Sequence, residues 1–267
     1  MPRTLKLTIS YDGTRFVGWQ RQAEGESIQG LLEDALARFE GAPVVVHGAG
    51  RTDAGVHALG QVASVRLTCG HDTAALARGL NAQLPGEVRV THVEDAAPDF
   101  HARFSARSKI YRYALRNAPL VSPFERAYVW HVPEPLDLEA MRAAAATLVG
   151  THDFAAFQSA GSGVTDTVRT MTRSELLVDV GRTLLAPPGE PDKARPTGDD
   201  AGLRVYEIEG DGFLRHMVRA VVGTLVEIGR GRRPPASMAA LLAGASRADA
   251  GATAPPQGLF LVRVDYD

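Results

Sequence analysis

The sequence has 267 residues with a formal net charge of −2, and 45% of its residues are hydrophobic while 22% are charged. These values are typical of a soluble globular protein of one large or two ordinary domains, and they exclude a disordered chain and one held to nucleic acid by bulk positive charge. The single cysteine, Cys69, excludes an intrachain disulfide and a cysteine-based zinc site.

The first part of the chain alternates strand and helix patterns. Hydrophobic periodicity predicts, in order, a strand at 4–10, a helix at 28–39, strands at 43–47 and 61–68, a helix at 73–81 and a strand at 88–93. Ser27 and Asp72 directly precede the two helices and are expected to cap them. This order predicts an α+β sandwich with helices on one face of a sheet.

The second part repeats these ingredients. The pattern predicts strands at 109–116, 127–132, 168–180, 203–210 and 259–266, and helices at 137–149, 213–228 and 236–242. Prolines, glycines and charges in 181–202 predict an exposed, mobile loop. We therefore expect an N-terminal α+β domain at 1–106 and a C-terminal α+β domain at 107–267. The N-terminus lacks a signal-peptide pattern and no run reaches transmembrane length, so we expect a cytoplasmic protein without membrane attachment.

A glycine-rich stretch at 48–60 lies between two predicted strands and carries Arg51, Asp53 and His57. Glycines let a backbone turn sharply and approach a ligand closely, and such loops are frequent sites of chemistry. Asp53 is therefore a candidate catalytic carboxylate. The alternative is that it is an ordinary turn residue, because aspartate also stabilises tight turns.

Two further segments combine basic and apolar residues. Segment 100–116 has four arginines, one lysine and four interleaved aromatic rings, which fits either a nucleic-acid face or a solvated strand edge with core aromatics. In segment 211–223, Arg215 and Arg219 are spaced to share one helix face beside an apolar stripe. Either they are functional residues that form an ion pair with a carboxylate, or they are surface residues whose aliphatic side-chain carbons lie along the apolar surface.

Several familiar chemistries are missing from the sequence. It has no Walker phosphate-binding motif, no complete dinucleotide fingerprint, no Gly-x-Ser-x-Gly nucleophile turn and no paired histidines with a carboxylate for a metal. A reaction without cofactor or metal, carried by Asp, Arg and Tyr side chains, is what remains.

Short motifs lie in order along nearly the whole chain. They are Tyr11-Asp-Gly-Thr14, Gly18-Trp-Gln-Arg-Gln22, Gly50-Arg-Thr-Asp-Ala-Gly-Val-His57, Asn81-Ala-Gln-Leu-Pro85, Asp99-Phe-His-Ala-Arg-Phe-Ser105, Tyr111-Arg-Tyr113, His216-Met-Val-Arg219 and Val264-Asp-Tyr266. Together they resemble the motifs of the tRNA pseudouridine synthases of the TruA type. The Gly50–His57 motif is the most specific of them.

The resemblance implies two similar ferredoxin- or RRM-like α/β sandwich subdomains, joined through a mainly antiparallel sheet, with the active-site cleft between them. It implies isomerisation of uridine to pseudouridine in the tRNA anticodon stem-loop, at positions 38–40, without cofactor or metal. By resemblance Asp53 is the nucleophile, Tyr111 stacks on the target base, Arg219 pairs with the aspartate and Arg51 assists base flipping. Attack of Asp53 at C6, attack at C1′ and a glycal route all stay open.

The same resemblance implies a homodimer that binds tRNA. Because the net charge is slightly negative, local arginines such as Arg103, Arg107 and Arg112 are expected to contact the phosphates. The alternatives are a pseudouridine synthase that acts on another RNA, and a non-catalytic tRNA-binding or tRNA-folding protein. A pure binder has no need of the Asp53 carboxylate.

Overall fold

The computed structural model describes residues 2–159, 161, 163–178 and 202–266. The chain forms two compact units: Met1–Arg107 with Phe260–Asp267, and Ser108–Leu259. Each unit is a mixed α/β structure with mainly antiparallel strands, which confirms the predicted fold class. Residues 181–201 of the predicted long loop lie outside the described residues.

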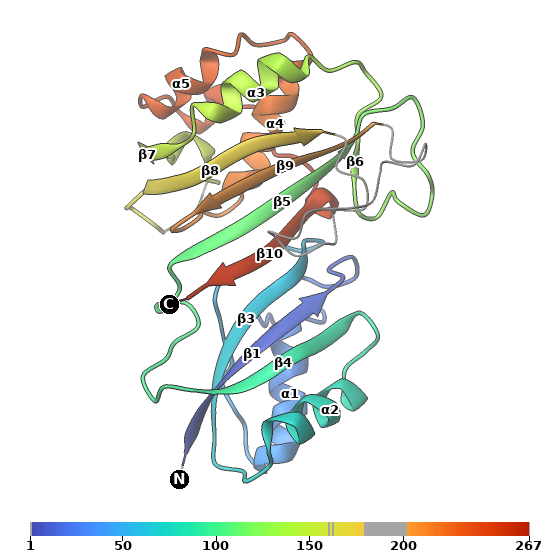
Figure 1. Cartoon of the computed structure of the whole chain (residues 1–267), viewed down its shortest axis with the longest axis vertical. Helices are drawn as coiled ribbons and strands as arrows, with labels where there is room; N and C mark the ends of the chain where they lie inside the picture. The colour runs from blue at the N-terminus through green and yellow to red at the C-terminus, as the bar shows by residue number, and fades with distance from the viewer. Residues whose placement is uncertain (1, 160, 162, 179–201, 267) are drawn as a thin grey trace. The chain divides into compact units, whose positions relative to one another are not determined.

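The first unit is built around a central antiparallel strand, β1, which pairs with β3 on one side and β4 on the other. Strand β2 pairs with β3 in antiparallel orientation, and β10 pairs with β3 in parallel orientation. Helices α1 and α2 pack on each other, and α2 packs on β4 (Figure 1). The elements are β1 (Arg3–Tyr11), α1 (Ile28–Glu40), β2 (His47–Gly48), β3 (His57–Leu67), α2 (Thr73–Gln83), β4 (Val88–Ala96) and β10 (Leu259–Asp265).

The two helices of this unit begin where the sequence predicts. The Ser27 hydroxyl accepts a hydrogen bond from the Gly30 amide (3.2 Å), and the Asp72 carboxylate accepts one from the Ala75 amide (2.7 Å). Each cap satisfies a backbone donor that the first helical turn leaves without an intrahelical partner. The chain order β1-α1-β2-β3-α2-β4 is that of a ferredoxin-like sandwich.

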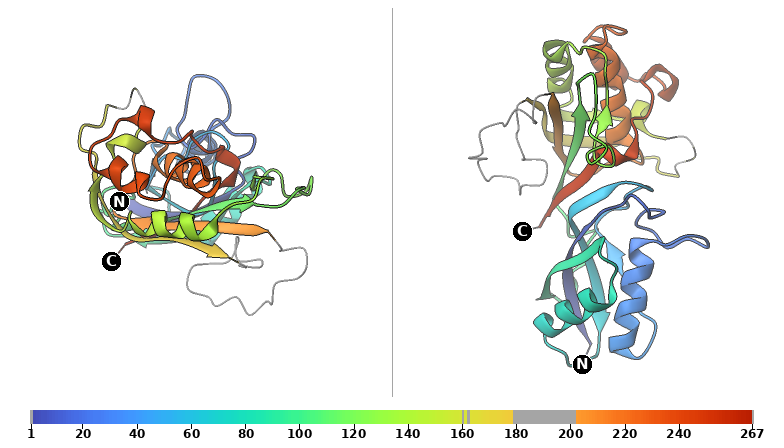
Figure 2. Two further views of the ribbon diagram at one scale, coloured as in Figure 1. Left: turned by 90° about the horizontal axis from the view of Figure 1, so that it is seen from above. Right: turned by 90° about the vertical axis from the view of Figure 1, so that its right-hand side faces the viewer.

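The second unit has strands in the order β5-β9-β8-β7, with β6 beside β5. Helix α3 packs on β8 and on α4, and the further views keep α3 and α4 side by side (Figure 2). A buried hydrogen bond fixes this layer, because the Ser174 hydroxyl of β8 lies 2.8 Å from the Ala145 carbonyl of α3. The elements are β5 (Ser108–Arg116), β6 (Trp130–His131), α3 (Leu138–Ala146), β7 (Gly150–Asp153), β8 (Val168–Val178), β9 (Leu203–Gly210), α4 (Met217–Gly229) and α5 (Ser237–Leu242).

The predicted strand at 43–47 is wrong, because only β2 forms there. The Val46 amide donates to the Glu33 carboxylate (3.2 Å), and the Val46 carbonyl accepts from the Gln29 side chain (3.0 Å). Side chains of α1 therefore satisfy backbone groups that a strand would have paired. The predicted strand at 127–132 likewise shrinks to the two residues of β6.

The predicted start of the 213–228 helix is also wrong, because α4 begins at Met217. His216 has φ of 63°, in the left-handed region, so no right-handed helix passes through it. Arg215 therefore precedes the helix and is exposed. The expectation that Arg215 and Arg219 share one helix face does not hold.

The last strand differs from the domain boundaries expected from the sequence. Residues 107–267 were expected to form one domain, whereas β10 pairs with β3 of the first unit, with Phe260 opposite His57. Parallel strands need a long connection, so the partner of β10 lies far from it in the sequence. Local periodicity identifies a strand but carries no signal for such a partner.

Candidate active site

Asp53 lies in the loop between β2 and β3 and is half-buried. The turn closes through a hydrogen bond from the Val56 amide to the Asp53 carbonyl (3.2 Å). Gly55 provides the left-handed backbone that this turn needs, with φ of 76°. Arg51, two positions before Asp53, is exposed on the same loop. Strand β3 begins at His57 rather than at the expected residue 61, so the loop is shorter than the sequence predicted.

Buried polar side chains of β1 and β3 hold Gly50 and Thr52, which precede Asp53 in the loop. The Tyr11 hydroxyl lies 2.8 Å from the Thr52 hydroxyl, and the Gln61 amide nitrogen donates to the Gly50 carbonyl (2.8 Å). Burial raises the pKa of Tyr11 to about 12, so this phenol stays protonated near neutral pH. Tyr11 and Gln61 thus anchor both sides of Arg51, although the sequence alone gave neither a role.

The segment around Gly18 crosses the same loop at close range. A Cβ on Gly18 would lie 2.6 Å from the Thr52 carbonyl oxygen, and its φ is 108°. The next residue, Trp19, donates its amide to that same carbonyl (3.0 Å). Only glycine permits both this backbone conformation and this approach. The two backbone segments are therefore fixed to each other beside Asp53.

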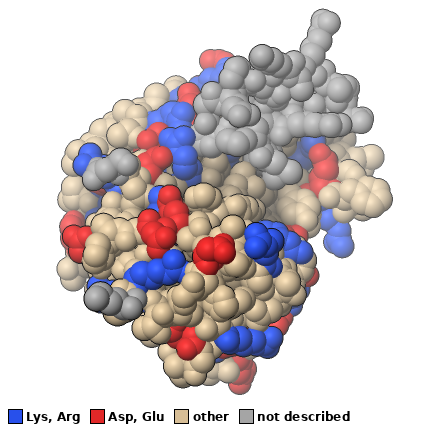
Figure 3. Space-filling view, turned by 60° about the horizontal axis from the view of Figure 1, so that its bottom comes forward, with Lys and Arg blue, Asp and Glu red and all other residues tan. Residues whose placement is uncertain are grey.

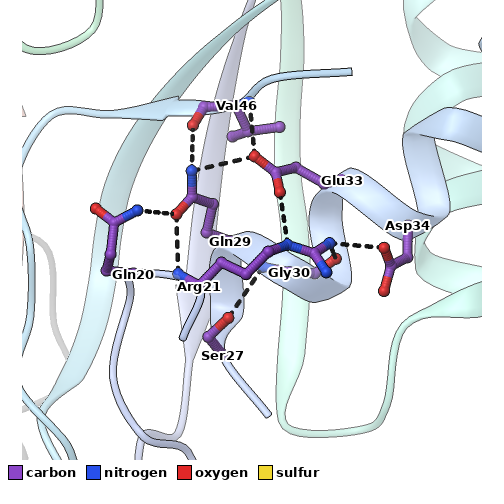
Figure 4. A network of polar contacts seen from close by, with 8 residues as sticks. All are labelled: Gln20, Arg21, Ser27, Gln29, Gly30, Glu33, Asp34 and Val46. Carbon is purple, nitrogen blue, oxygen red and sulfur yellow. Dashed lines mark hydrogen bonds and ion pairs between the residues drawn. The ribbon is translucent and has the colours of Figure 1, made fainter. Parts of the chain in front are cut away.

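A polar network on α1 extends this support (Figure 4). The buried Gln29 side chain accepts from the Gln20 side chain (2.7 Å) and the Arg21 amide (3.0 Å), and donates to the Val46 carbonyl. Gln29 therefore ties the Trp19 segment to the residue that precedes β2. The Trp19 segment contacts the Asp53 loop at Thr52, and β2 continues directly into that loop. The buried Gln29 amide therefore fixes both segments that adjoin the loop.

His57 ends the loop with a buried imidazole. Its Nδ1 accepts from the Gly13 amide (3.0 Å) and lies 3.2 Å from a carboxylate oxygen of Asp12. The ring stacks on Phe260, with centroids 4.7 Å apart. These contacts join the residues that follow β1 to the start of β3 and to β10. His57 thus has a structural place that the motif alone did not reveal.

Tyr111 and Arg219, the other candidate catalytic residues, belong to the second unit. Tyr111 is a buried residue of β5 whose ring meets Phe213 edge-on, with centroids 4.9 Å apart. Arg219 is half-buried in the first turn of α4, where its Nε donates to the Ala254 carbonyl (2.8 Å). The Arg219 guanidinium is thus held by a backbone carbonyl, and its backbone is held in helix α4.

The three arginines expected to contact phosphates differ in exposure. Arg103 and Arg107 are exposed. Arg112 is not, because its side chain is only 5% exposed and its Nε lies 2.5 Å from the Glu207 carboxylate. At Arg112, segment 100–116 is therefore a buried part of a strand and not an exposed basic face. Alternate residues of β5 point to opposite sides of the sheet. Arg112 lies on the side where the Glu207 carboxylate of β9 faces it.

Within the described ranges, no group of three or more His, Cys, Asp or Glu side chains is arranged to hold a metal ion. A search of the same residues for a helix of membrane-crossing length and hydrophobicity finds none. On the described part of the face drawn in Figure 3, basic and acidic side chains are interspersed. This mixture agrees with the formal net charge of −2.

The comparisons with known proteins cover nearly the whole chain. The family model described as tRNA pseudouridine synthase matches residues 7–105 and 144–267. The chain is 44% identical over 263 residues to tRNA pseudouridine synthase A of Syntrophotalea carbinolica, with 98% of this chain and 96% of that protein covered. It is 47% identical over 266 residues to the protein of the same name from Myxococcus xanthus, with 100% and 92% covered. The chain therefore belongs to the tRNA pseudouridine synthase family.

Proposed function

We propose that this protein isomerises uridine to pseudouridine in the anticodon stem-loop of tRNA, at positions 38–40. The observation that carries the proposal is the Asp53 loop, in which buried polar side chains hold Gly50 and Thr52, the two residues that flank Arg51, in a chain of this family. A turn residue alone would not need such support. Rigid placement of a carboxylate is what a nucleophile requires.

The reaction breaks the bond between N1 of the base and C1′ of the ribose and forms a bond between C5 and C1′. The proton on C5 leaves, and N1 gains a proton. Asp53 acts as the nucleophile that frees the base for rotation. The target nucleotide must first leave the helical stack, at a cost of about a few kcal/mol. Arg51, exposed on the same loop, assists that step.

Residues of the second unit complete the proposed chemistry. Tyr111 stacks on the base and is a candidate for removing the C5 proton, and Arg219 pairs with Asp53. In the first unit, the exposed Arg103 and Arg107 contact phosphates. Arg112 is left out of this role because it is buried against Glu207. By family resemblance the active form is a cytoplasmic homodimer.

Release of tritium from a tRNA transcript labelled at C5 of uridine tests the proposal. The parent protein is expected to release tritium from an anticodon stem-loop, with release lost when the uridines at 38–40 are replaced. Release should survive dialysis against EDTA, because no step needs a metal. Release only from another RNA would support the alternative substrate, and tight binding without release would support the non-catalytic alternative.

Tyr11→Phe tests the support beneath the loop. The substitution removes the hydroxyl that meets Thr52 and leaves a buried polar group without that partner. We expect a stability loss of about 1–3 kcal/mol and a single-turnover rate lowered about tenfold at saturating tRNA. The tRNA affinity should change less than about threefold, because Tyr11 is buried.

The matched control for this test is Thr52→Val, alone and combined with Tyr11→Phe. If the two hydroxyls act through each other, the double variant should lose little more rate than either single variant. Additive losses, or an unchanged rate in Tyr11→Phe at saturating tRNA, would contradict a positioning role.

A further inference from the structure

The turn that follows β4 in the first unit is fixed by its own hydrogen bonds. The His101 amide donates to the Ser105 hydroxyl (3.1 Å), and the Ser105 amide donates to the His101 carbonyl (2.9 Å). Between them, the Ala102 amide donates to the buried Ser64 hydroxyl of β3 (3.1 Å). The turn is therefore closed on itself and tied to the sheet, so side chains that project from it are held in place.

Three rings lie in a row across this turn and the neighbouring strand β2. His47 and His101 have ring centroids 4.8 Å apart at 33°, and His101 and Phe104 have centroids 4.4 Å apart at 36°. Phe104 ends the row and is 76% exposed. The Arg103 guanidinium carbon lies 5.6 Å from the centre of the Phe104 ring. We refer to His47, His101 and Phe104 as the ring row.

The middle ring is held neutral. Nδ1 of His101 accepts hydrogen bonds from the amides of Arg103 (3.1 Å) and Phe104 (3.4 Å), so in this arrangement it carries no proton. Burial, and then the neighbouring His47, lower the pKa of His101. A proton on Nδ1 would also break both hydrogen bonds. His101 is therefore a neutral ring in this row, and it is tilted by 33° and 36° to its two neighbours.

An exposed phenylalanine is common by itself, but one that packs against a row of two further rings on a closed turn is preorganised for a planar ligand. Exposed cations accompany it, since Arg103 and Arg107 lie on the same segment. Asp99 is an exposed acid two residues before the turn, so the local charge is mixed but carries more cations than anions. Flat rings for stacking with arginines for phosphate are the combination that binds unpaired nucleotides.

We propose that the ring row is a subsite on which an unpaired base of the substrate tRNA stacks against Phe104, while Arg103 contacts the adjoining phosphate. This inference rests on the proposed function for the identity of the RNA, but not for the stacking itself. The base that binds here is assigned to a nucleotide other than the target uridine, because the proposed function has the target base stack on Tyr111. The subsite contributes affinity and orientation rather than chemistry.

Binding of a tRNA transcript to Phe104→Leu and Phe104→Trp, measured by fluorescence anisotropy at fixed salt, tests the subsite. Leucine keeps an apolar side chain but loses the flat face, so the Kd should rise about tenfold and kcat/KM should fall by a similar factor. Tryptophan keeps the flat face and should bind within about twofold of the parent. Phe104 is largely exposed, so both variants should keep the parent melting temperature.

A matched pair of histidine variants provides the control. His47→Ala removes the ring at the other end of the row and should weaken binding, whereas His92→Ala removes an exposed imidazole of β4 and should leave binding unchanged. Parent-like binding by both Phe104→Leu and His47→Ala would overturn the subsite. So would a change in oligomeric state of Phe104→Leu without RNA, measured by sedimentation, because the row would then be an interface between copies.

Failure of the subsite and failure of the proposed function give different results. If the parent releases tritium and Phe104→Leu binds as the parent does, the subsite is wrong and the function stands. If the parent releases no tritium from any tRNA but Phe104→Leu still weakens binding about tenfold, the function is wrong and the subsite stands.

Discussion

Replacing Asp53 with asparagine is expected to reduce pseudouridine formation to the detection limit while leaving tRNA affinity within about tenfold, or 1.4 kcal/mol. Asparagine keeps the side-chain volume but removes the negative charge and nearly all nucleophilicity. The turn itself should survive, because its hydrogen bond joins the Val56 amide to the backbone carbonyl of residue 53. Binding depends on phosphate contacts and stacking elsewhere, so it should be largely unaffected.

The measurement is pseudouridine formed per enzyme in a single turnover, with protein made in a host that lacks its own synthase. Asp72→Asn is the matched control, because Asp72 caps α2 and an asparagine caps as well. That variant should keep the parent rate. A rate for Asp53→Asn above a few per cent of the parent would reduce Asp53 to a turn residue, which is the alternative that the sequence left open.

Local signals in the sequence were sufficient for much of the first unit. Ser27 and Asp72 cap their helices as expected, because a cap is a contact between residues three apart. Alternation of apolar residues likewise predicted β1 of this unit, and β5 of the second unit, almost to their ends. Each of these features depends on residues that are close in the sequence, and so the sequence pattern predicts it directly.

The failed predictions share a different cause. Val46 is not in a strand because side chains of α1 take its backbone groups, and Arg215 is outside α4 because His216 turns left-handed. Tyr11 and Gln61 support the Asp53 loop from strands on either side of it in the sequence. Contacts between distant segments decide the features at Val46, Tyr11 and Gln61, and the Arg215 carbonyl likewise accepts from the distant Ser159 amide (3.2 Å). Hydrophobic periodicity does not report such contacts.

Arg112 is the clearest example of a contact that the sequence pattern does not report. Replacing its partner, Glu207, is expected to have the second large effect, on stability. Arg112 and Glu207 face each other on β5 and β9, and their side chains are 5% and 3% exposed. Arg173 also donates to the Glu207 carboxylate (2.8 Å). Glu207→Gln leaves two guanidinium groups facing an amide without charge. We expect the free energy of unfolding, measured in urea, to fall by about 3–5 kcal/mol.

Two comparisons separate this structural role from RNA binding. Glu209→Gln removes a more exposed carboxylate near the same Arg173 and should cost about 1 kcal/mol or less. Changing both Arg112 and Glu207 to methionine should cost less than Glu207→Gln, because no unpaired charge stays buried. A small loss in Glu207→Gln would contradict the buried pair. If Arg112→Met then kept full stability but weakened tRNA binding, the phosphate contact expected from the sequence would be the better account of Arg112.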